Sequence, residues 1–109
     1  MSDITIHEEG DASQGRYVAR VAGIDAEAEL TFSSAGPGLV NADHAGAPAS
    51  LRGTGAAAAL VDRLVDDARQ KGFRIVPLCS YVRNRLEKHP EWSDVFAVDL
   101  DGRGAPGFV

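Results

Sequence analysis

The feature that most constrains the fold is a glycine loop that leads directly into an amphipathic helix. The loop reads RGTGAA and spans residues 52–57. Two glycines and no bulky side chain stand where the helix begins, so its first backbone N–H groups can approach an anion. Apolar residues then recur at helical spacing opposite a charged face, which predicts a helix over residues 55–71, about 25 Å long. Gly72 is well placed to end it.

Four extended segments are predicted before this helix. Residues 4–6 alternate between apolar and polar side chains, and residues 16–21 and 26–32 continue that alternation on either side of Gly23. A period of two with one apolar and one charged face predicts an antiparallel hairpin that is covered on one side only. A break at SAGPG precedes the fourth segment, residues 39–44.

A second strand and helix pair is predicted after the long helix. FRIVPL, residues 73–78, is typical of a short buried strand, in which Pro77 requires an edge position or a bulge. Ser80 is placed to cap a short helix that His89-Pro90 must end. The predicted class is therefore α+β, a mixed α/β arrangement.

The C-terminal part contains one more strand candidate and a tail. Residues 95–100 favour a last strand, whereas residues 101–109 have too little apolar content to order themselves and are predicted to be mobile. We therefore expect a single domain over residues 1–100. A chain of 109 residues is too small for two substrate domains.

Composition excludes several classes of protein. A net charge of −5 argues against non-specific nucleic-acid binding, and no apolar run is long enough to span a bilayer. The N-terminus lacks the features of a signal peptide, so a cytoplasmic location is expected. The single cysteine permits no intrachain disulfide. His7, His44 and His89 have no metal-ligand spacing, so no metal is predicted.

The glycine loop fits two common nucleotide motifs poorly. GTGAAA satisfies G-x-G-x-x-[GA], but a dinucleotide site needs an apolar strand before the first glycine, where this chain reads AGAPASLR, and an acidic residue after the next strand, where it reads Leu-Cys-Ser. A nucleotide P-loop needs a Lys-Ser or Lys-Thr pair, which is missing. What remains is R-x-x-G-x-A at Arg52, Gly55 and Ala57. A tight turn packed closely against a sheet is the alternative interpretation.

Taken together, RGTG opening a helix, PLCSYV and HPEW resemble the GNAT acetyltransferase superfamily. More specifically, the chain is similar to the small GNAT-like acetyltransferase domain proteins, a minimal branch that lacks the usual first two helices. The resemblance runs from the first hairpin to Trp92. It implies a mainly antiparallel sheet with a coenzyme A-binding helix and a short second helix, acetyl-coenzyme A as cofactor, and an amine as acceptor. It also implies that the coenzyme A diphosphate is wrapped by Arg52, Gly53, Thr54, Gly55, Ala56 and Ala57.

Three candidate catalytic residues follow. Cys79 lies between a strand and a helix, where a thiolate is stabilised and could take an acetyl group from the thioester; a small buried hydrophobe is the alternative. The competing chemistry is direct transfer with a base, for which Asp43 and His44 are candidates, and His44 matches the family's histidine.

The chain departs from the family pattern in two places. Residues 44–48 read His-Ala-Gly-Ala-Pro, whereas relatives usually follow the histidine with Thr, Glu and an apolar residue before the Pro. Arg85 stands where relatives often carry an aromatic residue. These departures leave three hypotheses: an N-acetyltransferase for an unidentified amine, a non-catalytic module that binds coenzyme A or acyl-coenzyme A, and a structural or interaction domain without cofactor.

Overall fold

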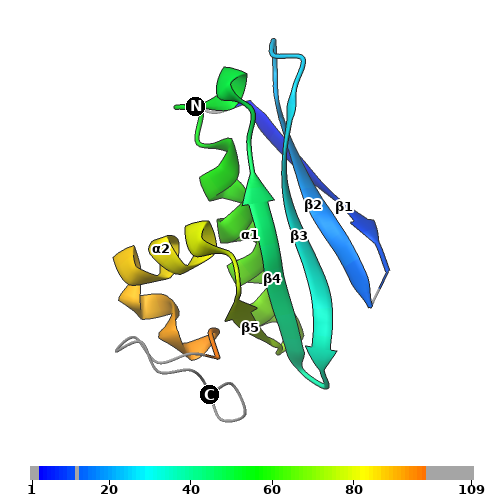
Figure 1. Cartoon of the computed structure of the whole chain (residues 1–109), viewed down its shortest axis with the longest axis vertical. Helices are drawn as coiled ribbons and strands as arrows, with labels where there is room; N and C mark the ends of the chain where they lie inside the picture. Colours follow the sequence, from blue (N-terminus) through cyan, green and yellow to red (C-terminus); the bar gives the residue numbers. More distant parts are fainter. Residues whose placement is uncertain (1–2, 12, 98–109) are drawn as a thin grey trace.

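The computed structural model describes residues 3–11 and 13–97, which form one five-stranded sheet and two α-helices (Figure 1). The strands lie in sequence order, and the first four pair antiparallel while the fifth runs parallel to the fourth. They are β1 (Ile4–Gly10), β2 (Gln14–Val21), β3 (Glu27–Gly36), β4 (Leu39–Gly46) and β5 (Arg74–Pro77). The helices are α1 (Ala56–Lys71) and α2 (Ser80–Lys88), with short 3-10 helices η1 (Ala49–Leu51) and η2 (Pro90–Asp94). The predicted α+β fold, the four leading strands and the long helix are confirmed.

The two faces of the sheet differ as the alternation predicted. One face packs against α1 and carries buried residues such as Tyr17, Ala19 and Leu30. The opposite face carries ion pairs across neighbouring strands, in which Arg16 bonds Glu9 and Glu29 at 2.8 Å each. This charged surface is called the open face below.

Helix α1 covers the core face of the sheet. Its buried side chains recur every three or four residues, as an amphipathic helix requires. They are Ala56, Leu60, Val61, Leu64, Val65, Asp67 and Ala68. Gly72 ends the helix with φ 80°, a left-handed conformation that favours glycine, and its N–H donates to the Ala68 carbonyl at 2.8 Å. This predicted C-terminus is confirmed.

Strand β5 lies at the sheet edge, which accommodates Pro77 as predicted. The predicted cap of α2 was wrong by one residue: Cys79 is the N-cap, and no side chain caps the helix. The reason is a backbone contact. The Cys79 N–H donates to the Ala42 carbonyl of β4 at 3.0 Å, so Cys79 stays extended and Ser80 becomes the first helical residue.

The chain after α2 returns to β5. Of the predicted last strand, residues 95–97 are described. There Phe96 forms an isolated bridge with Ile75 of β5. Trp92 is buried and stacks on His89 at 4.2 Å between ring centroids. Residues 98–100 of that strand and the predicted tail, residues 101–109, lie outside the described residues. In the described ranges, no helix combines the length and the apolar character needed to cross a bilayer.

A buried hydrogen bond joins α1 to the sheet. The Tyr17 hydroxyl donates to Asp67 Oδ2 at 2.6 Å, and Arg63 Nε lies 3.4 Å from Asp67 Oδ1. Both Tyr17 and Asp67 are buried. Burial first, and then the Asp67 carboxylate, raise the pKa of Tyr17 above its ordinary value.

Tyr17→Phe should lower the free energy of unfolding near neutral pH by about 1–3 kcal/mol, because Asp67 loses a buried donor. The loss should shrink above about pH 10, where Tyr17 ionises in the unfolded chain but not in the native one. This ionisation lowers the free energy of unfolding of the wild type but not of the variant, which lacks the hydroxyl. Denaturant unfolding of the wild type and the variant, near neutral pH and above about pH 10, measures the difference in the free energy of unfolding. Tyr81→Phe is the control, and a loss that is the same at both pH values would contradict the raised pKa.

Candidate functional site

Strands β4 and β5 pair over four residues and then separate, and this fork is where the candidate residues gather. Pairing runs from Leu39 opposite Arg74 to Ala42 opposite Pro77. Beyond that point β4 continues along β3 to Gly46, whereas the segment after β5 turns away into α2. The β3 pairing register skips Asp43, which marks a β-bulge at the fork. Bulges are over-represented beside active sites because they redirect side chains.

The glycine loop lies between η1 and α1. Gly53 and Gly55 have φ of 79° and 85°, so both need the left-handed conformation that glycine adopts easily. Thr54 closes the turn, because its hydroxyl donates to the Leu51 carbonyl at 2.6 Å and accepts from the Ala56 N–H at 3.2 Å. Ala56 is buried and fixes the loop to the core.

Several donors in this loop are free to bind a ligand. Within the described residues, the backbone N–H groups of Gly53, Gly55, Ala57 and Ala58 have no hydrogen-bond acceptor. A Cβ added at either glycine would meet no atom within 4 Å, so a ligand can come close to the backbone. Arg52 beside them is exposed and takes part in no ion pair with a described residue. The free donors, the guanidinium and the helix N-terminus fit a phosphate group.

Cys79 combines the two properties that the sequence offered as alternatives. It is the N-cap of the nine-residue helix α2, where a thiolate is favoured. It is also partly buried and packs against the hydrophobic core. Its backbone bond to Ala42 places it at the fork.

His44 lies on the open face, directly after the bulge. Its ring rests over Gly46, because a Cβ at that glycine would lie 3.1 Å from His44 Nε2. The ring borders a hollow of about 390 Å³. The hollow is lined by Arg16, Glu27, Glu29, His44, Gly46, Ala47 and Pro48. Among described residues, no hydrogen bond joins His44 to Cys79, so the structure brings the two candidates to one fork but not into a dyad.

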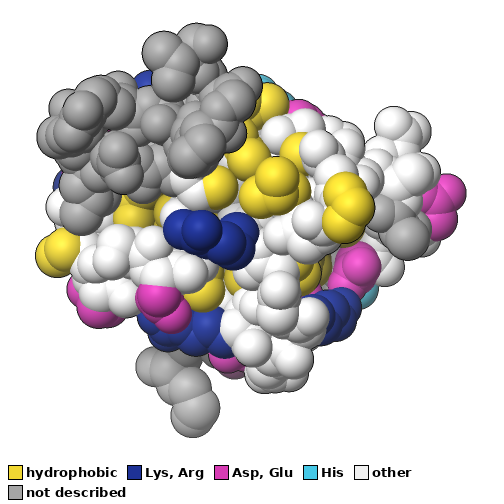
Figure 2. All heavy atoms as spheres, turned by 90° about the horizontal axis from the view of Figure 1, so that it is seen from below, with side chains coloured by type: hydrophobic (Ala, Val, Ile, Leu, Met, Phe, Trp, Pro, Cys, Tyr) yellow, Lys and Arg dark blue, Asp and Glu magenta, His cyan; other side chains and the backbone are white. Residues whose placement is uncertain are grey.

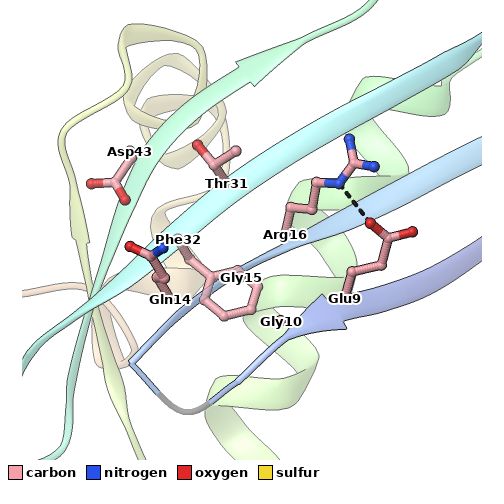
Figure 3. A pocket seen from close by; sticks show the side chains of 8 residues that line it. All are labelled: Glu9, Gly10, Gln14, Gly15, Arg16, Thr31, Phe32 and Asp43. Carbon is pink, nitrogen blue, oxygen red and sulfur yellow. Dashed lines mark hydrogen bonds and ion pairs between the residues drawn. The ribbon is translucent and has the colours of Figure 1, made fainter.

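Asp43 borders a second hollow of about 460 Å³, which shares Arg16 with the first (Figure 3). Gly10 and Gly15 line this hollow at the β1–β2 turn, and Arg16 at its side bonds Glu9 on the neighbouring strand at 2.8 Å. The two candidate bases are therefore neighbours in the chain that border different hollows.

The sequence analysis missed two acidic neighbours of His44. Glu27 and Glu29 line the same hollow because β3 pairs with β4 so that Glu29 lies opposite Gly46. Their alternation placed them on a charged face, but only the register shows which strand faces them. Arg85, the second departure from the family pattern, contacts Asp62 of α1 at 3.5 Å and lies over the Trp92 ring.

Comparison with known proteins assigns the family. A search of curated proteins found no match. A family model described as GCN5-related N-acetyl-transferase matches residues 16–95, which run from β2 through η2 and include the glycine loop, the bulge and Cys79. The match covers more than two thirds of the chain and agrees with the sheet and helices described above. The chain therefore belongs to the GCN5-related N-acetyltransferase family.

Proposed function

We propose that the protein binds acetyl-coenzyme A and transfers its acetyl group to an amine. The observation that carries this proposal is the set of free N–H groups in the loop at the start of α1, beside the exposed Arg52. Domains of this family generally use acetyl-coenzyme A. When bound, the cofactor would supply an acetyl thioester.

The loop residues 52–57 would hold the diphosphate. Gly53, Gly55 and Ala57 would donate backbone N–H groups, and Arg52 would add a positive charge. The partial charge at the N-terminus of α1 favours the same anion. This local field explains how a chain with a net charge of −5 can hold an anionic cofactor.

His44 is the proposed base for direct transfer. A neutral imidazole could take a proton from the acceptor ammonium; the free amine would then attack the thioester carbonyl, and the coenzyme A thiolate would leave and take up the proton that the nitrogen loses. Glu27 and Glu29 line the same hollow, where they are paired with Arg20 and Arg16. They also supply carboxylates where residues 45–47 have none.

Cys79 offers a second route. Its thiolate would attack the thioester carbonyl, form an acetyl-cysteine and release the coenzyme A thiolate, and the amine would then take the acetyl group from sulfur. We favour direct transfer because Cys79 packs against the core and no described side chain acts as its base.

A coenzyme A binding module without catalysis is the alternative function. The observation in its favour is that no described side chain bonds the His44 ring and fixes its orientation. Catalytic bases are commonly oriented by a further group. Binding retained without transfer to any amine in a screen of small amines, peptides and aminoacyl compounds would establish the module.

Gly55→Val should abolish coenzyme A binding, because the side chain enters the space in front of the free N–H groups. Gly72→Val is the matched control: that glycine has φ 80°, ends the same helix and also has open space around its Cβ position. Both variants carry a similar backbone strain of about 1–2 kcal/mol. Coenzyme A should raise the melting temperature of the wild type and Gly72→Val but not of Gly55→Val. Equal affinity in all three would place the cofactor elsewhere.

His44→Gln should lower kcat by about 10²–10⁴-fold while coenzyme A affinity stays unchanged, because the variant removes only the base. Release of the coenzyme A thiol in the presence of the best amine from the screen measures the rate. His7→Gln is the control, since His7 lies on β1 and bonds Glu9. If His44→Gln retained full activity, another group would have to act as the base.

Cys79→Ala should retain transfer within a few-fold, and intact mass spectrometry of the wild type after incubation with acetyl-coenzyme A should show no acetyl adduct. Direct transfer passes through no acyl-enzyme, which is the reason for this expectation. An acetyl adduct that is lost in Cys79→Ala would establish the covalent route instead.

A further inference from the structure

A third, more enclosed hollow lies at the C-terminal end of α1, against the core face of the sheet. Its volume is about 270 Å³, below the range typical of drug-sized ligands. Its walls are apolar and come from five separate parts of the chain. They are Tyr17, Phe32, Val40, Leu64 and Phe73, of which Tyr17 and Phe32 lie 5.1 Å apart between ring centroids.

This hollow is remote from the glycine loop. The loop precedes the first residue of α1, whereas the hollow is lined by Leu64 in the middle of α1 and by Lys71 at its end, which lie roughly 13 Å and 24 Å from the loop along the helix axis at about 1.5 Å per residue. Figure 2 views the molecule from this end and shows apolar side chains gathered around basic ones. A ligand here would not overlap a cofactor held at the loop.

The rim of the hollow offers one free carboxylate and one free ammonium group. Asp11 is already used, because it accepts from the Ser13 N–H, the Ser13 hydroxyl and the Gln14 N–H. Glu8 and Lys71 make no side-chain hydrogen bond or ion pair with any described residue. Glu8 projects from β1 and Lys71 from the end of α1, so the two opposite charges reach the rim from different elements.

The Tyr17 hydroxyl does not compete for a ligand. It donates to Asp67, and among the described residues the other polar side chains of the hollow, besides the two free charges and Asp11, are Ser33 and Ser34. Glu8 also contributes to the raised pKa of Tyr17, after burial and Asp67, which agrees with its carboxylate facing the hollow. The hollow thus presents two opposite charges beside an aromatic and aliphatic wall.

We propose that this hollow binds a free α-amino acid with an apolar side chain. Glu8 would accept from the ammonium group, Lys71 would donate to the carboxylate, and the side chain would lie against Phe32 and Phe73. A fatty acid or a simple amine would satisfy one charge and leave the other without a partner. The proposal is independent of the acetyltransferase function.

Chemical-shift titration of ¹⁵N-labelled protein tests the proposal with phenylalanine and leucine as probes. Phenylalanine should bind at least about tenfold more tightly than 3-phenylpropionate, which lacks the ammonium group, and than phenethylamine, which lacks the carboxylate, since a charge-assisted hydrogen bond is lost in each case. Equal affinity for all three compounds, or no shift with either amino acid at about 10 mM, would overturn it.

Two variants test whether Glu8 binds the ammonium group of the ligand and Lys71 its carboxylate. Glu8→Gln should weaken phenylalanine about tenfold and leave 3-phenylpropionate unchanged, whereas Lys71→Gln should weaken phenylalanine and leave phenethylamine unchanged. Both residues are exposed, so folding should be retained. Glu87→Gln and Lys88→Gln, exposed on α2, are the matched controls. If neither variant weakened phenylalanine, the ligand would not lie between Glu8 and Lys71.

Discussion

The packing of α1 on one face of the sheet is the constraint on which the rest of the structure depends. One helix buries a stripe that includes Leu60, Leu64 and Val65 against β2 and β3, and each such side chain contributes about 1.5–3 kcal/mol. The same helix holds the glycine loop at its beginning and delivers β5 to the sheet edge after its end. The loop, the fork and the hollow at Lys71 are therefore all positioned by one packing interface.

The open face has a different role. Its ion pairs are exposed, and pairs of this kind contribute at most about 1 kcal/mol each, so they do not hold the fold together. They keep one side of the sheet charged and free of a covering helix. The hollows beside Asp43 and His44 lie there, whereas the free N–H groups lie at the N-terminus of α1. In the proposed reaction the donor and the acceptor would therefore be held by different parts of the fold.

Local pattern predicted much of the fold and part of the site. Alternation predicted β1 to β3, the break at SAGPG marked the start of β4, and the helical period with Gly72 predicted α1 almost to the residue, because all of these signals depend on neighbours in the chain. The start of α2 was misplaced because it depends on the Ala42 carbonyl, which is 37 positions earlier in the chain. The bulge at Asp43 was not predicted, since a bulge is a property of two paired strands.

The sequence by itself determined which face of each strand is apolar, where the long helix begins and ends, and that glycines leave its first N–H groups accessible. These features follow from residue type and local spacing. Only the tertiary structure decided that Glu27 and Glu29 line the same hollow as His44 and that Cys79 lies at the fork. It also decided that Glu8 and Lys71 line one hollow. Such neighbours depend on strand register and helix packing, which a chain settles only when it buries its core.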